Sequence, residues 1–537
     1  MSKLSKINKK SKNNKTVKNF MDGTSYVLDP LNTLKIVLSS QIFGEKSFYR
    51  YSILSDQSES LPSNLSSQLN QGENDRFIED AIDAALSFDF KSTLDFAVEL
   101  RNDYFMRLNP AILYVRALMH NDRISFTEKY PGYFKGIADS IILIPSDISN
   151  MFEYYIYRNN GISKMPSLLK RTMASKMSGF SRYHIAKYKS KSLINIVRVT
   201  HASSTVINEL MKTGTVNFEE GNETWEKLKS EGKNWGEIIK KINIPHMALL
   251  RNLRGIALYC NNGKNLPYIN IDNMLNNLEA GVLSGKQFPF RYYTAYNEIK
   301  NNGELSIQLE GKILDSLNRC IQISIENFPK LSGNTISLCD NSGSAHGTFN
   351  SEYGSVKVSD IANLSGIITA SCSENGYVGV FGDRLNTFKV NDNSNILEQL
   401  KNVPDDVGQS TENGLWLFFK QAIENNEHWD NVFIYSDMQA GRGNLYGINP
   451  DEYSEYSYAG HDRYIDLMKL VKEYRCLVNP KLNIFSVQVA GYNNNVLPEN
   501  LYRGAILSGW TGKETLFASK INKIWDEVET SALTMEE

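Results

Sequence analysis

The sequence predicts two structural classes in series: an all-α part built from successive short helices, and then an α/β part with a doubly wound sheet. Two observations predict this fold. From about residue 31 to residue 328, apolar residues recur at a three-to-four spacing in one segment after another, which is typical of amphipathic helices. After Pro329, short β-branched and aromatic runs alternate with helical stretches, which indicates parallel βαβ units.

The all-α part is predicted to span residues 21–329. Polar stretches such as 58–74 and 261–267 separate its helical segments, of which the clearest are 80–102, 110–119, 167–176, 247–259 and 311–327. Roughly 300 residues of short helices favour helix pairs that stack as a HEAT-like solenoid or a closed ring, although the sequence shows no clean repeat period.

The α/β part is predicted to span residues 330–537. Its expected strands are 335–339, 377–381, 432–435 and 482–489, and its expected helices include 411–426 and 462–474. In doubly wound sheets, ligands bind at the carboxyl ends of the strands. A site is therefore expected among the residues that follow these strands.

Composition excludes several classes of protein. The formal net charge of −2 does not by itself indicate a nucleic-acid partner. Residues 1–20, however, carry seven lysines and no acid, which predicts a disordered basic tail. This tail is either simply solvated or contacts RNA phosphates. Five scattered cysteines without a CxxC pair argue against a disulfide scaffold or a zinc ribbon. The sequence has no apolar run of membrane-spanning length and no secretory signal, so we expect a cytoplasmic protein without a membrane partner.

A cluster of oxygen ligands follows two of the expected strands. Asp340, Ser342 and Ser344 form a DxSxS motif after the first strand, Thr411 opens a helix, and Asp437 ends another strand. Two carboxylates and three hydroxyls at one rim suit a hard divalent cation, Mg²⁺ first and Mn²⁺ as the other candidate. In the alternative interpretation, the serines only cap a helix and Asp340 forms a turn.

Basic residues are concentrated within 22 positions of the all-α part. The cations of this window have no Asp or Glu among them, and the aromatic residues Phe180, Tyr183 and Tyr188 are interleaved with them. Cations for phosphates beside flat rings for unpaired bases are typical of a single-strand RNA surface, whereas the alternative is a solvated helix face. The candidate RNA-binding residues are Lys170, Arg171, Lys176, Arg182, His184, Lys187, Lys189 and Lys191.

The oxygen cluster resembles the metal-ion-dependent adhesion site of von Willebrand factor A domains, over roughly residues 334–520. A helical half followed by such a domain resembles the Ro autoantigen, or TROVE-domain, family. The segments that carry this second resemblance are 48–55 (FYRYSILS), 187–189 (KYK) ahead of 197–201 (VRVTH), 244–253 (IPHMALLRNL) and 288–291 (FPFR). The family's WSH tripeptide is absent, Glu412 stands where relatives commonly have Asp, and Gln287 replaces the His of the family's HPF element.

The resemblance implies a monomeric helical ring closed by the A domain, similar to the bacterial members of the family. It further implies that the ring binds small noncoding Y-like RNA and the single-stranded ends of misfolded RNA in RNA quality control, with an exoribonuclease tethered through the RNA as a further partner. We expect no enzymatic activity, because the sequence has no GxSxG, Walker A or HExxH motif. The alternative function is a metal-dependent protein–protein adhesion or scaffold module, and a nuclease is disfavoured because the carboxylate cluster already matches the adhesion-site pattern.

Overall fold

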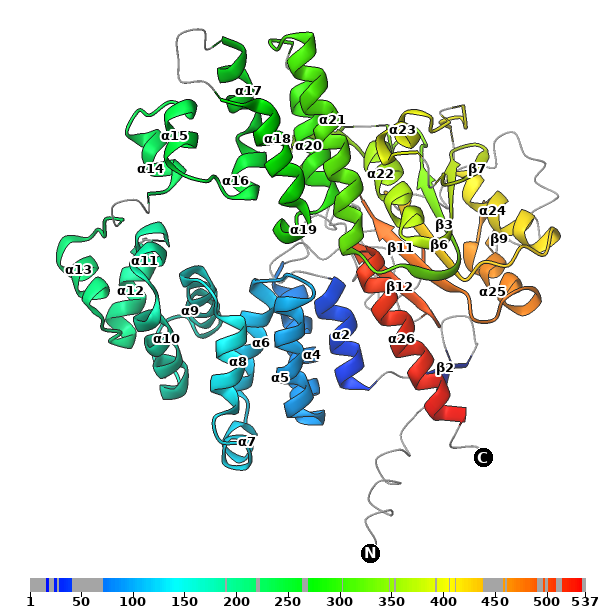
Figure 1. Ribbon diagram of the computed structural model, residues 1–537. Coiled ribbons are helices and arrows are strands. Elements are labelled where there is room, and N and C mark those ends of the chain that lie inside the picture. Colours follow the sequence, from blue (N-terminus) through cyan, green and yellow to red (C-terminus); the bar gives the residue numbers. More distant parts are fainter. Residues whose placement is uncertain are drawn as a thin grey trace, which may run out of the picture. The chain divides into compact units, whose positions relative to one another are not determined.

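A computed structural model gives the structure of the chain (Figure 1). It describes residues 16–18, 24–26, 29–40, 71–188, 191–218, 223–262, 269–301, 303–346, 348–351, 354–391, 394–404, 406–410, 412–437, 457–458, 461–489, 496–497, 501–508 and 514–533. Of these, 29–40 and 71–244 form one compact unit. The short strands near the N-terminus and residues 245–533 belong to the other.

In its described residues, the first unit contains helices as its regular secondary structure. They are α2 (Pro30–Ser40), α4 (Gln71–Phe88), α5 (Phe90–Asn102), α6 (Leu108–Met119), α7 (Arg123–Lys129), α8 (Tyr133–Ile141), α9 (Pro145–Asn159), α10 (Ser167–Gly179), α11 (Arg182–Tyr188), α12 (Lys191–Thr200), α13 (Thr205–Thr213), α14 (Trp225–Ser230) and α15 (Trp235–Lys241). Helix α5 packs against α6, its neighbour in the chain, and also against α8, and α6 packs against α9.

The sequence predicts one continuous helix over 80–102, and this prediction was wrong, because the segment contains the end of α4 and the whole of α5. Asp89 separates α4 from α5, and its carboxylate accepts a hydrogen bond from the Ser92 backbone N–H at 3.1 Å. An Asp in this position satisfies a backbone donor that a new helix would otherwise leave unpaired. The apolar pattern continues across the break, because both helices bury apolar residues.

The second unit begins with helices as well. They are α16 (His246–Arg251), α17 (Leu253–Asn262), α18 (Ile271–Ala280), α19 (Val282–Gly285), α20 (Pro289–Lys300), α21 (Ile307–Ser324) and the 3₁₀ turn η1 (Ile325–Asn327). The predicted helix 247–259 is again two helices, divided at Asn252, whose side chain donates to the Ala248 carbonyl. The contacts group α16 to α21 with the sheet that follows, which begins at Leu331.

The sheet has six strands in the order β12-β11-β8-β3-β6-β7. These are β3 (Leu331–Asp340), β6 (Ser373–Phe381), β7 (Leu385–Lys389), β8 (Asn431–Ser436), β11 (Asn483–Gln488) and β12 (Gly504–Ser508). All neighbouring pairs are parallel except β6 and β7. The strand order reverses between β3 and β8, and this switch point is where doubly wound sheets place their ligands.

Helices cover both faces of the sheet, which explains why its central strands are fully buried (Figure 1). One face packs against α24 (Asn413–Glu424) and α25 (Leu467–Leu477). On the other face, α22 (Val358–Ser371) contacts β3, β6 and β8, and α26 (Glu514–Leu533) contacts β11 and β3. The short helix α23 (Ile396–Lys401) precedes α24 in the chain.

Gly366 allows α22 to lie unusually close to β3. A Cβ atom added at Gly366 would lie 2.2 Å from the Cys339 sulfur, a separation that the two buried groups could not accommodate. The Cys339 Sγ meanwhile contacts the Ala362 carbonyl oxygen at 3.2 Å, one turn earlier in the helix. This close packing fixes the strand that carries Asp340 at its end.

The prediction of a helix over 462–474 was wrong at its start. Residues His461–Ile465 form strand β10, which pairs with β9 (Ser457–Tyr458), and α25 begins only at Leu467. Asp466 caps that helix by accepting the Met468 backbone N–H at 3.0 Å. Two further antiparallel pairs are described, β4 (Thr348–Ser351) with β5 (Gly354–Lys357), and β1 (Thr16–Lys18) with β2 (Thr24–Tyr26).

The order of elements confirms the predicted fold class, in which an all-α part precedes a doubly wound α/β part. Strand β1 occupies the end of the predicted basic tail, and residues 1–15 and the segment 48–55 lie outside the described residues. Among the helices described, none combines the length and the apolar character that crossing a membrane requires.

Candidate metal centre and nucleic-acid interface

Two buried carboxylates meet at the switch point of the sheet. Asp340 ends β3, Asp437 follows β8, and the register pairs Cys339 with Tyr435, so the two aspartates leave neighbouring strands at the same edge. Neither side chain is exposed to solvent. The Asp340 carboxylate accepts hydrogen bonds from the Ser436 hydroxyl at 2.6 Å and from the Ser342 backbone N–H at 2.9 Å.

The hydroxyls of the DxSxS motif lie beside this pair. Ser342 Oγ and Ser344 Oγ are 3.2 Å apart, and Ser342 is buried whereas Ser344 is exposed. Between Asp340 and Ser342, the Asn341 amide is held by two reciprocal hydrogen bonds with the Asn363 amide, of 2.8 and 3.0 Å. This paired amide anchors the loop to α22, so the side chains predicted to bind the cation lie on a rigid support.

A second loop runs against the first. The Gly343 backbone N–H donates to the Gln409 carbonyl at 3.0 Å, and a Cβ at Gly343 would lie only 2.6 Å from that oxygen. Glycine is therefore required between the two serines of the motif, because the Gln409 carbonyl occupies the space that a side chain would need. Thr411, the fifth predicted ligand, lies outside the described residues, but Gln409 and Glu412 on either side of it are described.

The electrostatics of the site favour a cation. Burial, together with the charge of Asp437, raises the pKa of Asp340 to about 6. Burial and then the charges of Asp340 and Asp437 raise the pKa of Glu412 to about 7. Negative charge at this rim thus opposes the ionisation of both Asp340 and Glu412, and a divalent cation would relieve that repulsion.

The donor set fits a hard divalent ion. Asp340 and Asp437 offer carboxylate oxygens and Ser342 and Ser344 offer hydroxyls, which is the ligand chemistry of Mg²⁺. In the described part of the chain, no group of three or more His, Cys, Asp or Glu side chains is arranged to hold a metal. A cation at this rim would therefore need hydroxyl ligands as well as carboxylates. The electrostatic role of Glu412 was missed at the sequence level, although its position beside the threonine of the ligand pattern was a usable signal.

The predicted RNA-binding residues fall on consecutive helices of the first unit. Lys170, Arg171 and Lys176 lie on α10, and Arg182, His184 and Lys187 lie on α11. Lys189 is outside the described residues, and Lys191 is the first residue of α12. Arg171 and Lys187 are exposed, whereas the other four residues on α10 and α11 are half-buried.

Two of these cations are already paired with acids from other helices. Lys176 Nζ lies 2.5 Å from Asp139 on α8, and the Arg182 guanidinium makes two contacts with the Glu209 carboxylate on α13, of 2.5 and 3.0 Å. The Arg182 hydrogen bonds hold the pKa of Glu209 below its usual range. The window itself contains no acidic residue, but Asp139 and Glu209 from other helices contact two of its cations. Its cations therefore form two sets, one paired with acids and one unpaired.

Aromatic rings form a cluster beside Lys187. The rings of Phe180 and Tyr183 both contact the His184 imidazole, at centroid distances of 5.6 and 5.8 Å. Tyr183 also contacts Phe218 at 5.8 Å, and Lys187 Nζ lies 5.5 Å from the centre of the Tyr183 ring. Phe218 was missed because it is far away in sequence. The result is a cluster of half-buried rings beside an exposed ammonium group.

Comparisons with known proteins identify the architecture. Neither the family models nor the curated proteins give a match to this sequence. Among solved structures, the chain is similar to the Ro (RSR) protein of Deinococcus radiodurans, with a TM-score of 0.59 and 11% sequence identity, over 91% of this chain and 99% of that one. The chain therefore has the fold of a Ro protein along nearly its whole length.

Proposed function

We propose that the chain is a non-enzymatic RNA-binding protein that binds small noncoding RNA and single-stranded RNA ends, and that its α/β part holds a divalent cation. The observation that carries the proposal is the cluster of cations and rings on α10 and α11. It occurs in a chain with the fold of a Ro protein, and the sequence resemblance to the Ro family implies RNA quality control as the setting.

The chemistry of this surface suits unpaired RNA. Lys170, Arg171 and Lys187 have no acidic partner among the described residues, so their charge is available to phosphates. The Tyr183 ring lies one helical turn before Lys187, and together with the neighbouring Phe180 ring it can stack with bases, which suits single strands of any sequence. Structured RNA would be held mainly by the phosphate contacts.

The cation has a structural role in this proposal. The two aspartates and two serines described at the rim would hold Mg²⁺, with Thr411 as the further predicted ligand. When bound, the ion would neutralise the repulsion between the buried carboxylates. The chain itself contributes the rigid loop support, through the amide pair to α22 and the contact between the two loops.

The test compares two double variants that remove the same charge from the same two helices. Lys170→Ala with Lys187→Ala removes unpaired cations, and Lys176→Ala with Arg182→Ala removes paired ones. If each unpaired cation contacts one phosphate, the slope of log K against log salt falls by about 0.7–0.9 per residue in the first variant, and by less in the second. Equal slopes in the parent and the first variant would remove these helices from the RNA interface.

A second candidate function is metal-dependent adhesion to an acidic group of another protein. The exposure of Ser344 favours it, because one side of the ligand set then faces solvent. Purification distinguishes the two functions. Co-purified RNA, seen as a raised ratio of absorbance at 260 and 280 nm, supports RNA binding, and a ratio typical of pure protein supports adhesion.

A further inference from the structure

The ring cluster on α11 continues past Tyr183 onto a segment that is distant in the sequence. Phe218, between α13 and α14, contacts the Tyr183 ring with a centroid distance of 5.8 Å and an interplanar angle of 58°. Both residues are half-buried, and because the rings are tilted rather than stacked, neither covers the whole face of the other. The pair therefore keeps part of its aromatic surface open to solvent.

An ammonium group lies beside each of these two rings. Lys187 Nζ lies 5.5 Å from the centre of the Tyr183 ring, and Lys227 Nζ, from α14, lies 6.0 Å from the centre of the Phe218 ring. Lys227 also approaches Glu231 at 3.8 Å, but a partly exposed pair at this separation holds its lysine only weakly. Two rings thus carry a cation on either side, and the four groups come from α11, α14 and the segment before α14.

Arg182 holds the backbone that leads to Phe218. Its guanidinium donates hydrogen bonds to the Glu209 carboxylate on α13 and to the Asn217 carbonyl, the latter at 3.3 Å. Val216, one residue further back, is buried, with 2% of its surface exposed. Because a charged donor and a buried side chain fix the two residues before Phe218, its ring is held in place against α11.

This arrangement suits a nucleic-acid strand whose bases are unpaired. Such bases can stack on aromatic rings while ammonium groups on either side contact the phosphates. A duplex keeps its base faces inside the stack, so it can use the ammonium groups but not the rings. Glu219 and Glu220 follow Phe218 directly in the sequence and weaken the positive charge at this end, so stacking has to supply most of the affinity there.

We propose that a single strand of RNA crosses from Lys187 on α11 to Lys227 on α14, and that one of its bases stacks on Phe218. In this proposal Arg182 is a positioning residue, which orients the Phe218 ring through the neighbouring carbonyl and contacts no phosphate. The inference rests on the proposed RNA-binding function and extends it, because the cations considered above lie on α10, α11 and α12, whereas this path reaches α14.

The experiment measures the affinity of the full-length protein for a single-stranded uridine decamer by fluorescence anisotropy, over a series of salt concentrations. Phe218→Ala should lower the affinity about tenfold and leave the slope of log K against log salt unchanged, because it removes a ring and no charge. Lys227→Ala should lower that slope by about 0.7. Lys229→Ala is its matched control and should leave the slope unchanged, since Lys229 is an exposed lysine on the same helix whose ammonium group lies over Trp235 instead.

The role of Arg182 has its own readout. Arg182→Ala should lower the affinity for the decamer without changing the salt slope, and it should have no further effect in the Phe218→Ala background, because both changes remove the same platform. Phe218→Tyr keeps an aromatic ring and should bind like the parent. Tyr130→Ala is the matched ring control, since Tyr130 is half-buried and has the Lys129 ammonium 5.2 Å from its ring centre, at the end of α7.

Two further probes separate stacking from a general loss of folding. A blunt-ended RNA duplex should bind equally to the parent and to Phe218→Ala, and a decamer that lacks bases at its central positions should weaken binding to the parent more than to Phe218→Ala. Equal affinities of parent and Phe218→Ala for the intact decamer, an equal loss with the duplex, or a lower salt slope in Arg182→Ala would overturn the inference and leave the proposed function standing. Absence of decamer binding by the parent would overturn both.

Discussion

Replacing Asp340 by Asn should stabilise the metal-free protein while abolishing its response to Mg²⁺. Asn has nearly the same shape, and its amide can still accept the Ser342 N–H and form a hydrogen bond with Ser436. What it removes is a buried charge that opposes Asp437. Replacing an aspartate that has only a structural role normally lowers the stability of the protein. The sign of the change in stability therefore distinguishes a cation-binding aspartate from a structural one.

The magnitude follows from the pKa of Asp340. Burial and the Asp437 charge raise that pKa from 3.8 to about 6, which corresponds to roughly 3 kcal/mol at about 1.4 kcal/mol per tenfold change. Because the folded state holds the proton more tightly than the unfolded state, the stability of the metal-free parent falls as pH rises from about 4 to about 6. The advantage of Asp340→Asn should therefore be absent below about pH 4 and complete above about pH 6 to 7.

Urea denaturation in the presence of a chelator, at about pH 4 and about pH 7.5, measures this difference. A titration with Mg²⁺ at the higher pH should then raise the stability of the parent by mass action and leave the variant unchanged. Asp406→Asn, an exposed carboxylate in the loop before Thr411, is the control and should behave like the parent. A metal-free Asp340→Asn protein that is less stable than the parent at the higher pH, or one that retains Mg²⁺ affinity, would refute the reasoning.

Two further predictions concern stability. Gly366→Ala should cost about 1–3 kcal/mol in chemical denaturation, because the new Cβ would lie 2.2 Å from the Cys339 sulfur, whereas Gly311→Ala, which has open space around its Cα, should not destabilise the protein. Burial alone would raise the pKa of Glu529, but hydrogen bonds from Arg503 and Tyr502 lower it to about 2. The stabilisation from Glu529 should thus be complete above about pH 4.5 and lost as pH falls toward about 2, so the melting temperatures of parent and Glu529→Gln should differ at about pH 6 and converge near pH 2.

The parts of the fold that the sequence predicts depend on local periodicity. The β-branched and aromatic runs in β3, β6, β8 and β11 are typical of strands, so the sequence predicts these four elements correctly. Because ligands bind at the carboxyl ends of such strands, the sequence also predicts that Asp340 and Asp437 lie together. The helix breaks at Asp89 and Asn252 were missed because the apolar pattern runs on across them. A capping side chain decides such a break, and its effect depends on geometry that spacing does not encode.

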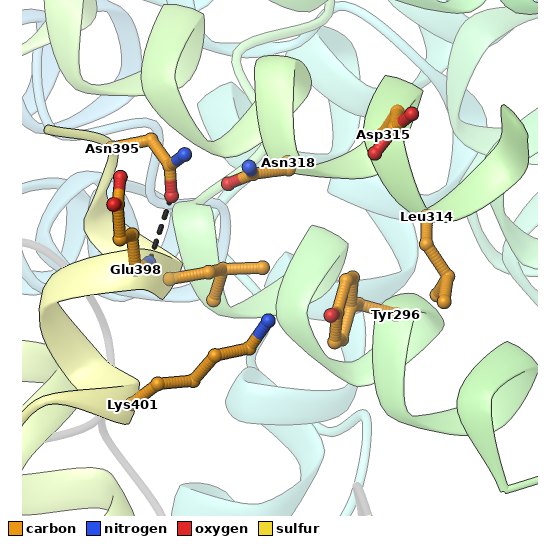
Figure 2. Close-up of a pocket in the computed structure, with 8 residues that line it drawn as sticks. Tyr296, Leu314, Asp315, Asn318, Asn395, Glu398 and Lys401 are labelled. Atoms are coloured by element: carbon orange, nitrogen blue, oxygen red, sulfur yellow. Dashed lines mark hydrogen bonds between the residues drawn. The ribbon is translucent and has the colours of Figure 1, made fainter. Parts of the chain in front are cut away.

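The parts that could not be predicted depend on distant residues. Lys176 and Arg182 look like free cations within their window, and only the packing of α8 and α13 brings Asp139 and Glu209 to them. Phe218 joins the ring cluster in the same way. The pocket lined by Tyr296, Asn318 and Lys401 could not be predicted either, because its walls come from three helices that meet only in the folded protein (Figure 2).

The contact between Asp340 and the end of β8 also has a consequence for the order of events in folding. Ser436 and Asp340 are 96 positions apart, so the carboxylates converge only after β3 and β8 have paired across the elements that separate them in the chain. Such non-local pairing is slow to form, and the separate strands cannot bring the ligands of an ion together beforehand. A cation bound at this rim would therefore act on the assembled sheet. It would slow unfolding by holding the two strand ends together, and it would leave the rate of refolding unchanged.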